Sequence, residues 1–522
     1  MNTKKHTGSY YTPAYLAEFI TKRVIGSFLD NKLKVLEPSV GDGAFISELS
    51  KVTNKNILLT ALDINEIELE KASLKWDNKE SFIKINFLDF EVDEKFSLIV
   101  GNPPYIQKKL LKEEDLQKIK KVHFQEKLSE NSVNNIWTSF LIKSVSLLKN
   151  NGIIAFVLPS ELLQVKYAKE IRKYLINKFD RIEIFTFNDL MFECKGQDTI
   201  VFFGYLIHPE GGQYFANIES QQQLISGDFL LQKNDILIEN DTKWSHHFLN
   251  EADLDFIIEL RNRVNTIGYY ADSKPGIVTA ANNFFIINKE IEDKYNLKNY
   301  TYPIIQKGQF VNGSVLFDEE DFNILTKNNL PTKFLYIKDS DVISDKLREY
   351  IKIGEDLKLN KRYKCTLRNK WFVVPNVSTI PKAFFFKRAH LYPKLLKNNA
   401  NAYVTDSAYK IEVKEGIEIN SFIFSFYNSL TLLFAELEGR YYGGGVLELI
   451  PSEFKKLPLP YICISEEDFN NFVEDFEKKS SIEEVLSKYN YSILNRVLGL
   501  SNEEITRIES IRVKLLNKRT RK

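Results

Sequence analysis

Hydrophobic residues in the first 205 positions form short apolar runs, which alternate with longer segments whose apolar residues recur at helical spacing. Glycine, proline, asparagine or aspartate bounds the runs, as is typical of buried strands. The pattern predicts strands at 34–37, 57–62, 82–85, 96–100, 153–159, 182–185 and 199–203, and helices at 13–28, 44–52, 67–74, 132–149 and 165–179. We expect Asn151-Gly152 to close the 132–149 helix and the last two strands to pair like a hairpin. This alternation predicts an α/β fold with a doubly wound, mostly parallel sheet.

The fourth strand ends in a stiff turn, Asn102-Pro103-Pro104-Tyr105. The two prolines forbid continuation of a helix or a sheet, and open α/β sheets place their ligands at the carboxyl ends of strands. The Asn102 side-chain oxygen and the Pro103 carbonyl are two acceptors, which match the two hydrogens of an exocyclic amino group. An amine held in this way aims its lone pair at an electrophile, while Tyr105 would stack on the ring that carries the amine. Such a turn acts by positioning and electrostatics rather than by removing a proton with a strong base.

A loop rich in glycine and acid follows the first strand. Glu37 ends the strand, and Gly41-Asp42-Gly43 lets the backbone turn tightly and approach a ligand closely. No Lys-Ser/Thr pair follows the glycines, which argues against a phosphate-binding loop. The two carboxylates would also repel a phosphate. They favour a cationic ligand, such as a sulfonium that carries an ammonium group.

The ends of the second and third strands supply candidates for the rest of that ligand. Asp63 ends the second strand, where an acid is placed to accept both hydroxyls of a ribose. Asn86 and Phe87 follow the third strand, and an amide with a phenyl ring can hold an adenine by hydrogen bonding and stacking. Near the start of the chain, Thr12 is expected to cap a helix that has Pro13 at its first position.

Together these motifs resemble the class I S-adenosylmethionine-dependent methyltransferases. More narrowly, they resemble the gamma-class, Taq-type DNA adenine N6-methyltransferases of type II restriction-modification systems, in which a Thr-Gly-x-Tyr-x-Thr-Pro element, here Thr7 to Pro13, precedes the cofactor loop. The resemblance is close over residues 7–205 and looser beyond. It implies that S-adenosyl-L-methionine contacts Tyr11, Thr12, Glu37, Gly41, Asp63, Asn86, Phe87, Asn102 and Phe156.

The resemblance also implies how a flipped target adenine is held. Its catalytic residues would be Asn102, Pro103, Tyr105 and Phe192, with Phe192 stacking on the face of the base opposite Tyr105. The family often has aspartate at the position of Asn86, so Asp89 is a second candidate for the contact to the cofactor's adenine. No metal ion is expected in this chemistry.

The second half of the chain contains one strongly basic stretch. Residues 361–397 hold ten lysines and arginines, interleaved with aromatic residues, and no aspartate or glutamate. Because the whole chain has 71 basic against 70 acidic residues and a net charge of +1, this stretch indicates a local anion-binding face. Some cations would contact phosphates and others base edges. The candidate DNA-binding residues are Arg362, Lys364, Arg368, Lys387, Arg388 and Arg440.

The pattern of the second half predicts a mixed α+β target recognition domain followed by C-terminal helices. We expect a helix at 250–264, a strand and polar turn at 275–286, a strand at 404–411 and a helix at 421–437. The last sixty residues should be helical, with capping boxes at Ser481-x-x-Glu484 and Ser501-x-x-Glu504. The predicted domains are a catalytic domain at 1–240, a target recognition domain at 241–462 and a helical segment at 463–522, with duplex DNA bound between the first two.

The function expected from these features is site-specific methylation of an adenine amine in duplex DNA, as the modification part of a restriction-modification system. The Asn-Pro-Pro-Tyr turn also occurs in enzymes that methylate protein glutamine or ribosomal RNA guanine, so RNA and protein acceptors stay open. A non-catalytic DNA-binding module is a further alternative. No Pro-Asp…Glu-x-Lys nuclease signature is present, so cleavage is not expected of this chain, and a cognate restriction endonuclease is a possible partner.

Composition narrows the cellular setting. The three cysteines, Cys194, Cys365 and Cys463, lie far apart and form neither a metal-ligand spacing nor a disulfide framework, which favours a reducing compartment. The chain has no apolar signal core near its start and no apolar run of the roughly 18 residues that a membrane span needs. A soluble, cytoplasmic protein without membrane partners is expected.

Overall fold

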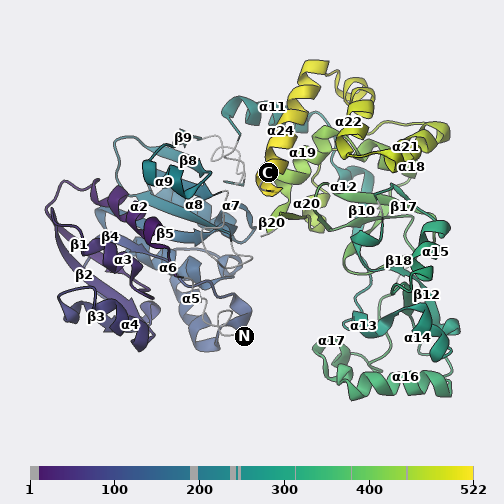
Figure 1. Cartoon of the computed structure of the whole chain (residues 1–522), viewed down its shortest axis with the longest axis horizontal. Coiled ribbons are helices and arrows are strands. Elements are labelled where there is room, and N and C mark those ends of the chain that lie inside the picture. Colours follow the sequence, from purple (N-terminus) through teal and green to yellow (C-terminus); the bar gives the residue numbers. More distant parts are fainter. Residues whose placement is uncertain are drawn as a thin grey trace. The chain divides into compact units, whose positions relative to one another are not determined.

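A computed structural model of the chain describes residues 11–187, 198–234, 243–244, 249–311, 313–377, 379–442 and 445–520. Its contacts divide it into two units (Figure 1). The N-terminal unit is formed mainly by residues up to Leu254, and the C-terminal unit by Asp255–Tyr441 together with Gly445–Thr520.

A nine-stranded sheet in the order β3-β2-β1-β4-β5-β7-β6-β8-β9 forms the centre of the N-terminal unit. The strands are β1 Lys32–Glu37, β2 Asn56–Asp63, β3 Phe82–Lys84, β4 Phe96–Gly101, β5 Leu148–Pro159, β6 Arg181–Phe187, β7 Thr199–Tyr205, β8 Gly212–Ile218 and β9 Gln232–Lys233. Strands β3, β2, β1, β4 and β5 are parallel, whereas β7 runs antiparallel between β5 and β6. The predicted doubly wound sheet and the pairing of its last two predicted strands are therefore confirmed.

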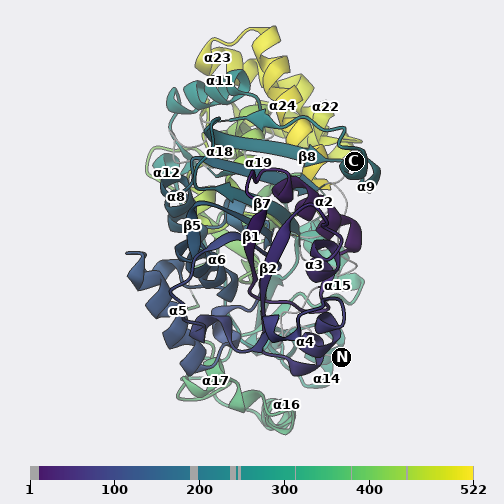
Figure 2. The ribbon, with the colours of Figure 1, turned by 90° about the vertical axis from the view of Figure 1, so that its left-hand side faces the viewer.

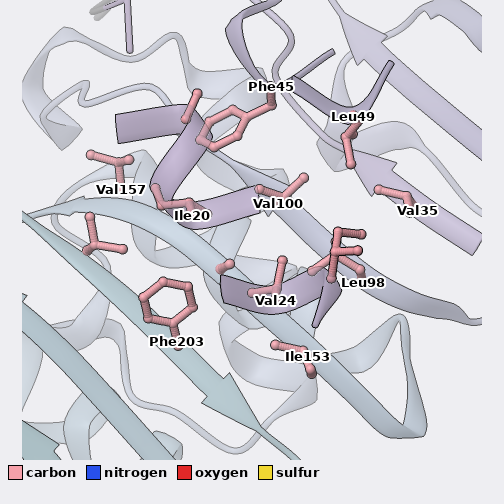
Figure 3. Packing of buried hydrophobic residues seen from close by; sticks show 14 of the residues in the cluster. Ile20, Val24, Val35, Phe45, Leu49, Leu98, Val100, Ile153, Val157 and Phe203 are labelled. Atoms are coloured by element: carbon pink, nitrogen blue, oxygen red, sulfur yellow. The ribbon is translucent and has the colours of Figure 1, made fainter. Parts of the chain in front are cut away.

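Helices connect these strands (Figure 2). They are α2 Ala14–Ile25, α3 Ala44–Leu49, α4 Glu66–Ser73, α5 Glu113–Gln125, α6 Ile136–Ser146, α7 Glu161–Gln164, α8 Ala168–Lys178 and α9 Gln221–Ser226. On one face of the sheet, Ile20 and Val24 of α2 and Phe45 of α3 pack against inward-facing strand residues such as Val100 (Figure 3). This core fixes the strand ends from which the candidate site residues project.

One predicted helix end lies inside a strand. Helix α6 ends at Ser146, and β5 begins at Leu148, which pairs with Phe96 of β4. The next pair is Leu98 with Ile153, so the polar residues around Gly152 form a bulge in β5. The prediction that Asn151-Gly152 closes the helix is wrong, because the turn signal belongs to this bulge.

The C-terminal unit contains three smaller sheets and many short helices. The sheets are β10-β19-β15-β17-β13, β11-β14-β12-β18 and β16-β21-β20. Their strands are β10 Ala271–Pro275, β11 Ile286–Ile287, β12 Thr301–Ile305, β13 Leu316–Phe317, β14 Lys333–Leu335, β15 Ala383–Phe386, β16 Arg388–Ala389, β17 Lys394–Asn398, β18 Tyr403–Val404, β19 Ala408–Val413, β20 Arg440–Tyr442 and β21 Val446–Glu448. The α+β character predicted for this half is confirmed.

The helices of this half begin with α11 at the boundary between the units. They are α11 Glu251–Asn262, α12 Ile267–Tyr270, α13 Asn282–Phe285, α14 Lys289–Lys294, α15 Glu319–Lys327, α16 Asp345–Asp356, α17 Tyr363–Thr366, α18 Ile419–Phe426, α19 Ser429–Glu438, α20 Pro451–Phe454, α21 Glu466–Lys478, α22 Ile482–Asn490, α23 Arg496–Leu498 and α24 Asn502–Thr520. The helix predicted at 421–437 is two helices, because the Asn428 side chain accepts from the Thr431 N–H and starts α19 anew.

Two further local predictions differ from the structure. The segment 275–286, predicted as a strand and a polar turn, contributes only its end residues to strands, because β10 ends at Pro275 and β11 begins at Ile286, after α13. The capping box predicted at Ser501 and Glu504 is present, with reciprocal bonds to their N–H groups. At α22, however, Glu484 accepts from the N–H of Ser480 at 2.9 Å, and the Ser481 side chain makes no capping bond.

Candidate functional site

A cavity of about 430 Å³ opens at the carboxyl ends of the parallel strands in the N-terminal unit. Glu37 ends β1 and Asp63 ends β2, while Asn102 follows β4, and all three line this cavity. Strand β1 lies between β2 and β4, so the chain reverses its direction across the sheet there. Ligands of open α/β sheets bind in the crevice at such a switch point.

Glu37 is a buried carboxylate with an unused oxygen. Its side chain is 1% exposed, and its Oε2 has no hydrogen-bond partner among the described residues. Burial raises the pKa of Glu37 well above its ordinary value, and the nearby carboxylates of Asp63 and Asp42 raise it further. An uncompensated buried carboxylate is costly, so a cationic group at this position would supply the missing partner.

Asp63 holds the glycine loop in place. Its Oδ2 accepts a 2.9 Å bond from the N–H of Gly41, whose φ is +53°, and its Oδ1 accepts a 2.8 Å bond from the N–H of Asn65. Each carboxylate oxygen has a second lone pair, so Asp63 keeps capacity for hydroxyl donors in the cavity. Gly43 must lack a side chain, since a Cβ there would lie 2.8 Å from that of Ala72.

Asn86 and Phe87 form another wall of the cavity. The Asn86 amide nitrogen donates to Asp115 Oδ1 at 3.3 Å, and its oxygen accepts from the N–H of Leu88 at 3.0 Å. The Phe87 ring is 1% exposed and packs on another ring, Phe140, 5.0 Å away between centroids. Asp89, the second candidate, accepts a 2.8 Å bond from Lys118 and does not line the cavity.

The turn after β4 presents an oriented amide. Asn102 Oδ1 lies 2.8 Å from the hydroxyl of Tyr105, which donates to it, and Asn102 Nδ2 donates to Thr12 Oγ1 at 3.3 Å. The same Tyr105 hydroxyl lies 3.0 Å from the carbonyl oxygen of Val157. Tyr105 is 8% exposed, so its phenol holds the amide from the protein side.

The Thr12 hydroxyl has a different role from the predicted one. The residue that caps α2 is Pro13, and no side chain caps this helix. The Pro13 carbonyl instead accepts from Leu16 and Ala17. The prediction that Thr12 caps the helix is wrong, because its buried hydroxyl is taken by the amide of Asn102.

The remaining predicted residues lie at different depths. Tyr11 is 48% exposed and lines the cavity, whereas Pro103 is buried and the next residue, Pro104, lines it. Phe156 is fully buried behind the turn, with a ring atom 3.7 Å from the place of a Cβ on Gly101, and it does not line the cavity. Phe192 lies outside the described residues.

Three charged lining residues were not among the predicted ones. Glu68 of α4 and Asp115 of α5 add negative charge, and Lys112 is next to the start of α5. Burial and the Glu68 carboxylate raise the pKa of Tyr11, whose phenol contacts Glu68. Glu68 lies on the helix that directly follows Asp63, so its helical position is a signal that sequence reasoning can use. No signal in the sequence points to Asp115, since its approach to Asn86 depends on the path of the loop after β4.

Four of the six predicted DNA-binding residues line two cavities of the C-terminal unit. Arg362 and Lys364 line the Arg362 cavity, of about 1000 Å³, and Lys387 and Arg388 line the Lys387 cavity, of about 1280 Å³. Arg368 lies behind the first, where it donates to the carbonyls of Thr279 at 2.8 Å and of Trp371 at 3.1 Å. Burial lowers the pKa of Arg368.

Two of these arginines have carboxylate partners. Arg388 contacts Glu448 Oε2 at 2.5 Å, although its own side chain is 63% exposed. Arg440 lines neither cavity and contacts Glu453 Oε1 at 2.9 Å. Surface ion pairs are weak, so the pair of Arg388 with Glu448 contributes little to stability.

Comparison with known proteins identifies the family. Residues 27–192 match the family described as Eco57I restriction-modification methylase, and residues 241–494 match the C-terminal domain of type II methyltransferase M.Eco57I. Type II methyltransferase M.AccI of Acinetobacter calcoaceticus is 25% identical over 97% of this chain and 93% of its own length. The chain belongs to the type II restriction-modification methyltransferases.

Further proteins match the methyltransferase over part or nearly all of its length. Type II methyltransferase M.HincII of Haemophilus influenzae is 28% identical over 38% of this chain and 37% of its own. The solved structure of the type IIL restriction-modification enzyme MmeI in complex with DNA has a TM-score of 0.58 and 13% identity, and covers 97% of this chain and 75% of that one. At that identity the likeness shows the fold.

Two kinds of feature are absent from the described residues. Across them, no group of three or more histidine, cysteine, aspartate or glutamate side chains is placed to hold a metal ion. No helix in the described parts of the methyltransferase combines the length and the apolar character that crossing a bilayer needs.

Proposed function

We propose that this methyltransferase transfers a methyl group from S-adenosylmethionine to the N6 amine of an adenine that is flipped out of duplex DNA. It would be the modification part of a restriction-modification system, with an endonuclease of the same recognition sequence as partner. In this proposal residues 1–240 carry catalysis, residues 241–462 recognise the target, and 463–522 form a helical segment. Relatives named type II methyltransferases and the MmeI structure with DNA support the substrate class.

The cavity at the ends of β1, β2 and β4 fits the proposed cofactor. Its acidic residues suit the ammonium and sulfonium charges, and the unpaired oxygen of Glu37 is the observation on which the fit depends. Asp63 would accept ribose hydroxyls, and Asn86 with Phe87 would contact the adenine. When bound, S-adenosylmethionine supplies an electrophilic methyl group.

The Asn102 turn supplies the acceptors for the target amine. Asn102 Oδ1 and the Pro103 carbonyl would each accept one hydrogen of the amino group, which turns its lone pair toward the cofactor side of the cavity. Tyr105 and Thr12 fix the amide through bonds of 2.8 Å and 3.3 Å. The proton lost from the amine would pass to water. Positioning of this kind is worth several kcal/mol of the barrier without a strong base.

DNA binding would use the cations of the C-terminal unit. Lys364 and Lys387 line its two cavities and would contact phosphates, whereas arginines such as Arg362 can also contact base edges. Flipping the adenine costs a few kcal/mol, which these contacts would offset. The observation that carries the proposal is that the unpaired Glu37 oxygen and the oriented Asn102 amide face one cavity.

The proposal is tested with labelled S-adenosylmethionine and duplex DNA. Asn102→Ala should lower kcat about 10²–10³-fold, in line with the loss of one oriented polar group in other active sites, while cofactor binding is retained. Asn177→Ala, on the exposed side of α8, is a matched control that should keep full activity. Transfer to RNA or to a protein glutamine instead of DNA, or unchanged turnover by Asn102→Ala, would refute the proposal.

A further inference from the structure

The Arg362 and Lys387 cavities meet at one residue, Asp406, which lines both. Asp406 lies in the short loop between β18 and β19 and is half-buried. Apart from it, the charged groups of the two linings are mostly cationic. The lysines, arginines and histidine that line them are Lys294, Arg362, Lys364, Lys307, Lys387, Arg388, His390, Lys394 and Lys479.

Asp406 differs from the other acids of the two linings in having no partner. Glu290 accepts a 3.2 Å bond from the amide of Asn329, and Glu483 pairs with Arg512 at 2.6 Å. No hydrogen bond or ion pair of the Asp406 carboxylate occurs within the described parts of the chain. A carboxylate surrounded by cations that do not pair with it is available to a ligand.

The backbone around Asp406 is held rigidly. The hydroxyls of Thr405 and Ser407 both donate to the carbonyl of Gln306, and the N–H of Asp406 donates to the Ile277 carbonyl at 3.1 Å. Gly276 packs so closely that a Cβ there would lie 2.2 Å from the Thr405 carbonyl oxygen. The Thr405 and Ser407 hydroxyls are therefore taken by the backbone, although Ser407 also lines the Lys387 cavity, and the Asp406 carboxylate is the charged group that this loop offers, with little further entropy to lose on binding.

The chemistry of duplex DNA limits what such a carboxylate can bind. Phosphates repel it, and thymine offers no amino group, so its partners on base edges are exocyclic amino groups. Cytosine N4 and adenine N6 present these donors in the major groove, and guanine N2 presents one in the minor groove. Lysines and arginines on either side would hold the flanking phosphates and so bring a base edge to the carboxylate.

We propose that Asp406 determines part of the recognition sequence by accepting a hydrogen bond from the exocyclic amino group of one base. The inference rests on the proposed function in one respect, that the C-terminal unit binds duplex DNA. The wrong base at that position would leave the carboxylate without a donor. One good base contact discriminates by about 5- to 150-fold.

The experiment selects duplexes of random sequence on the full-length protein and sequences those retained. Wild type is compared with Asp406→Asn, whose amide both donates and accepts, and with Asp406→Ala. The control is Glu415→Gln, which removes the same charge from an exposed residue at the other end of β19. We expect both Asp406 variants to lose about 5- to 150-fold of discrimination at one position, where wild type selects cytosine, adenine or guanine. Every other position and the control should be unchanged, which also shows that the variants fold.

The outcomes separate this inference from the proposed function. An unchanged selection in both variants, or an equal weakening at all positions, would overturn the role of Asp406. So would a wild-type protein that selects no sequence. Methyl transfer to the selected duplexes is measured separately. Relaxation at one position without methyl transfer leaves the inference standing and refutes the proposed function.

Discussion

Replacing Glu37 by glutamine should weaken cofactor binding and stabilise the cofactor-free protein at the same time. The substitution keeps the size of the side chain and removes a negative charge from a site that is 1% exposed. The Oε2 atom of Glu37 has no partner among the described residues, so the buried charge costs stability until a cation binds. Weaker cofactor binding together with higher stability would identify Glu37 as part of a ligand site, whereas replacing a structural carboxylate would lower stability.

The magnitudes follow from the burial. A hydrogen bond to a charged group contributes about 1.5–3 kcal/mol, so Glu37→Gln should raise the Kd of S-adenosylmethionine by about 10- to 150-fold. Removing an unsatisfied buried charge should stabilise the cofactor-free protein by about 1 kcal/mol, the low end of the desolvation penalty, because glutamine is still polar. For a unit of this size that corresponds to roughly 2–4 °C in Tm.

The pH dependence of this effect has a defined sign. Burial raises the pKa of Glu37 in the folded state, so the folded protein loses stability relative to a non-titrating variant as pH rises through that raised pKa. The advantage of Glu37→Gln should therefore be present at pH 8 and vanish below the ordinary glutamate pKa of about 4.3. Cofactor affinity of the wild type should increase with pH over the same range, since the ionised carboxylate is the form that binds a cation.

The assays are titration calorimetry with S-adenosylmethionine at pH 6 and pH 8, and thermal unfolding with and without cofactor. Glu70→Gln, on the exposed side of α4, makes the same charge change outside the cavity and should alter neither quantity. A Kd within twofold of wild type, or a Glu37→Gln protein that is less stable without cofactor, would refute the assignment of Glu37 to a cationic ligand.

Three further predictions concern other sites. Tyr105→Phe removes the hydroxyl that holds Asn102. Since a neutral hydrogen bond is worth about 0.5–1.5 kcal/mol, single-turnover methyl transfer should slow roughly 2- to 13-fold, while the Kd of the cofactor stays unchanged. An equal change in the transfer rate and in the cofactor Kd would instead place Tyr105 in cofactor binding. Gly276→Ala puts a Cβ 2.2 Å from the Thr405 carbonyl oxygen and should lower the free energy of unfolding by about 1–3 kcal/mol, as measured by denaturant unfolding. An unfolding midpoint equal to that of wild type would contradict the close packing. If Lys387 neutralises one phosphate, Lys387→Gln should reduce the slope of log K for DNA binding against log salt concentration by about 0.9, as measured by fluorescence anisotropy from about 50 to 200 mM salt. An unchanged slope would show that Lys387 is not part of the DNA interface.

Local pattern was sufficient for the sheet and for the residues at its strand ends. Strands and helices of the N-terminal unit are set by apolar periodicity over a few residues, and parallel strands bring their carboxyl ends to one edge. For that reason Glu37, Asp63 and Asn102 line the same cavity, as their positions after strands predicted. The same local evidence misplaced the end of α6, because a turn signal such as Asn151-Gly152 serves a bulge as well as a helix end.

What the amino-acid sequence determined by itself was the fold class, the family and the set of polar groups at the strand ends, all of which depend on neighbours close along the chain. Tertiary structure alone decided the partner of each group. Thr12 binds an amide 90 residues away instead of capping its own helix, and Gly276 holds the loop of Asp406. A side chain has only a few donors and acceptors, so its role depends on which groups folding brings within hydrogen-bond distance, and sequence spacing does not encode that distance.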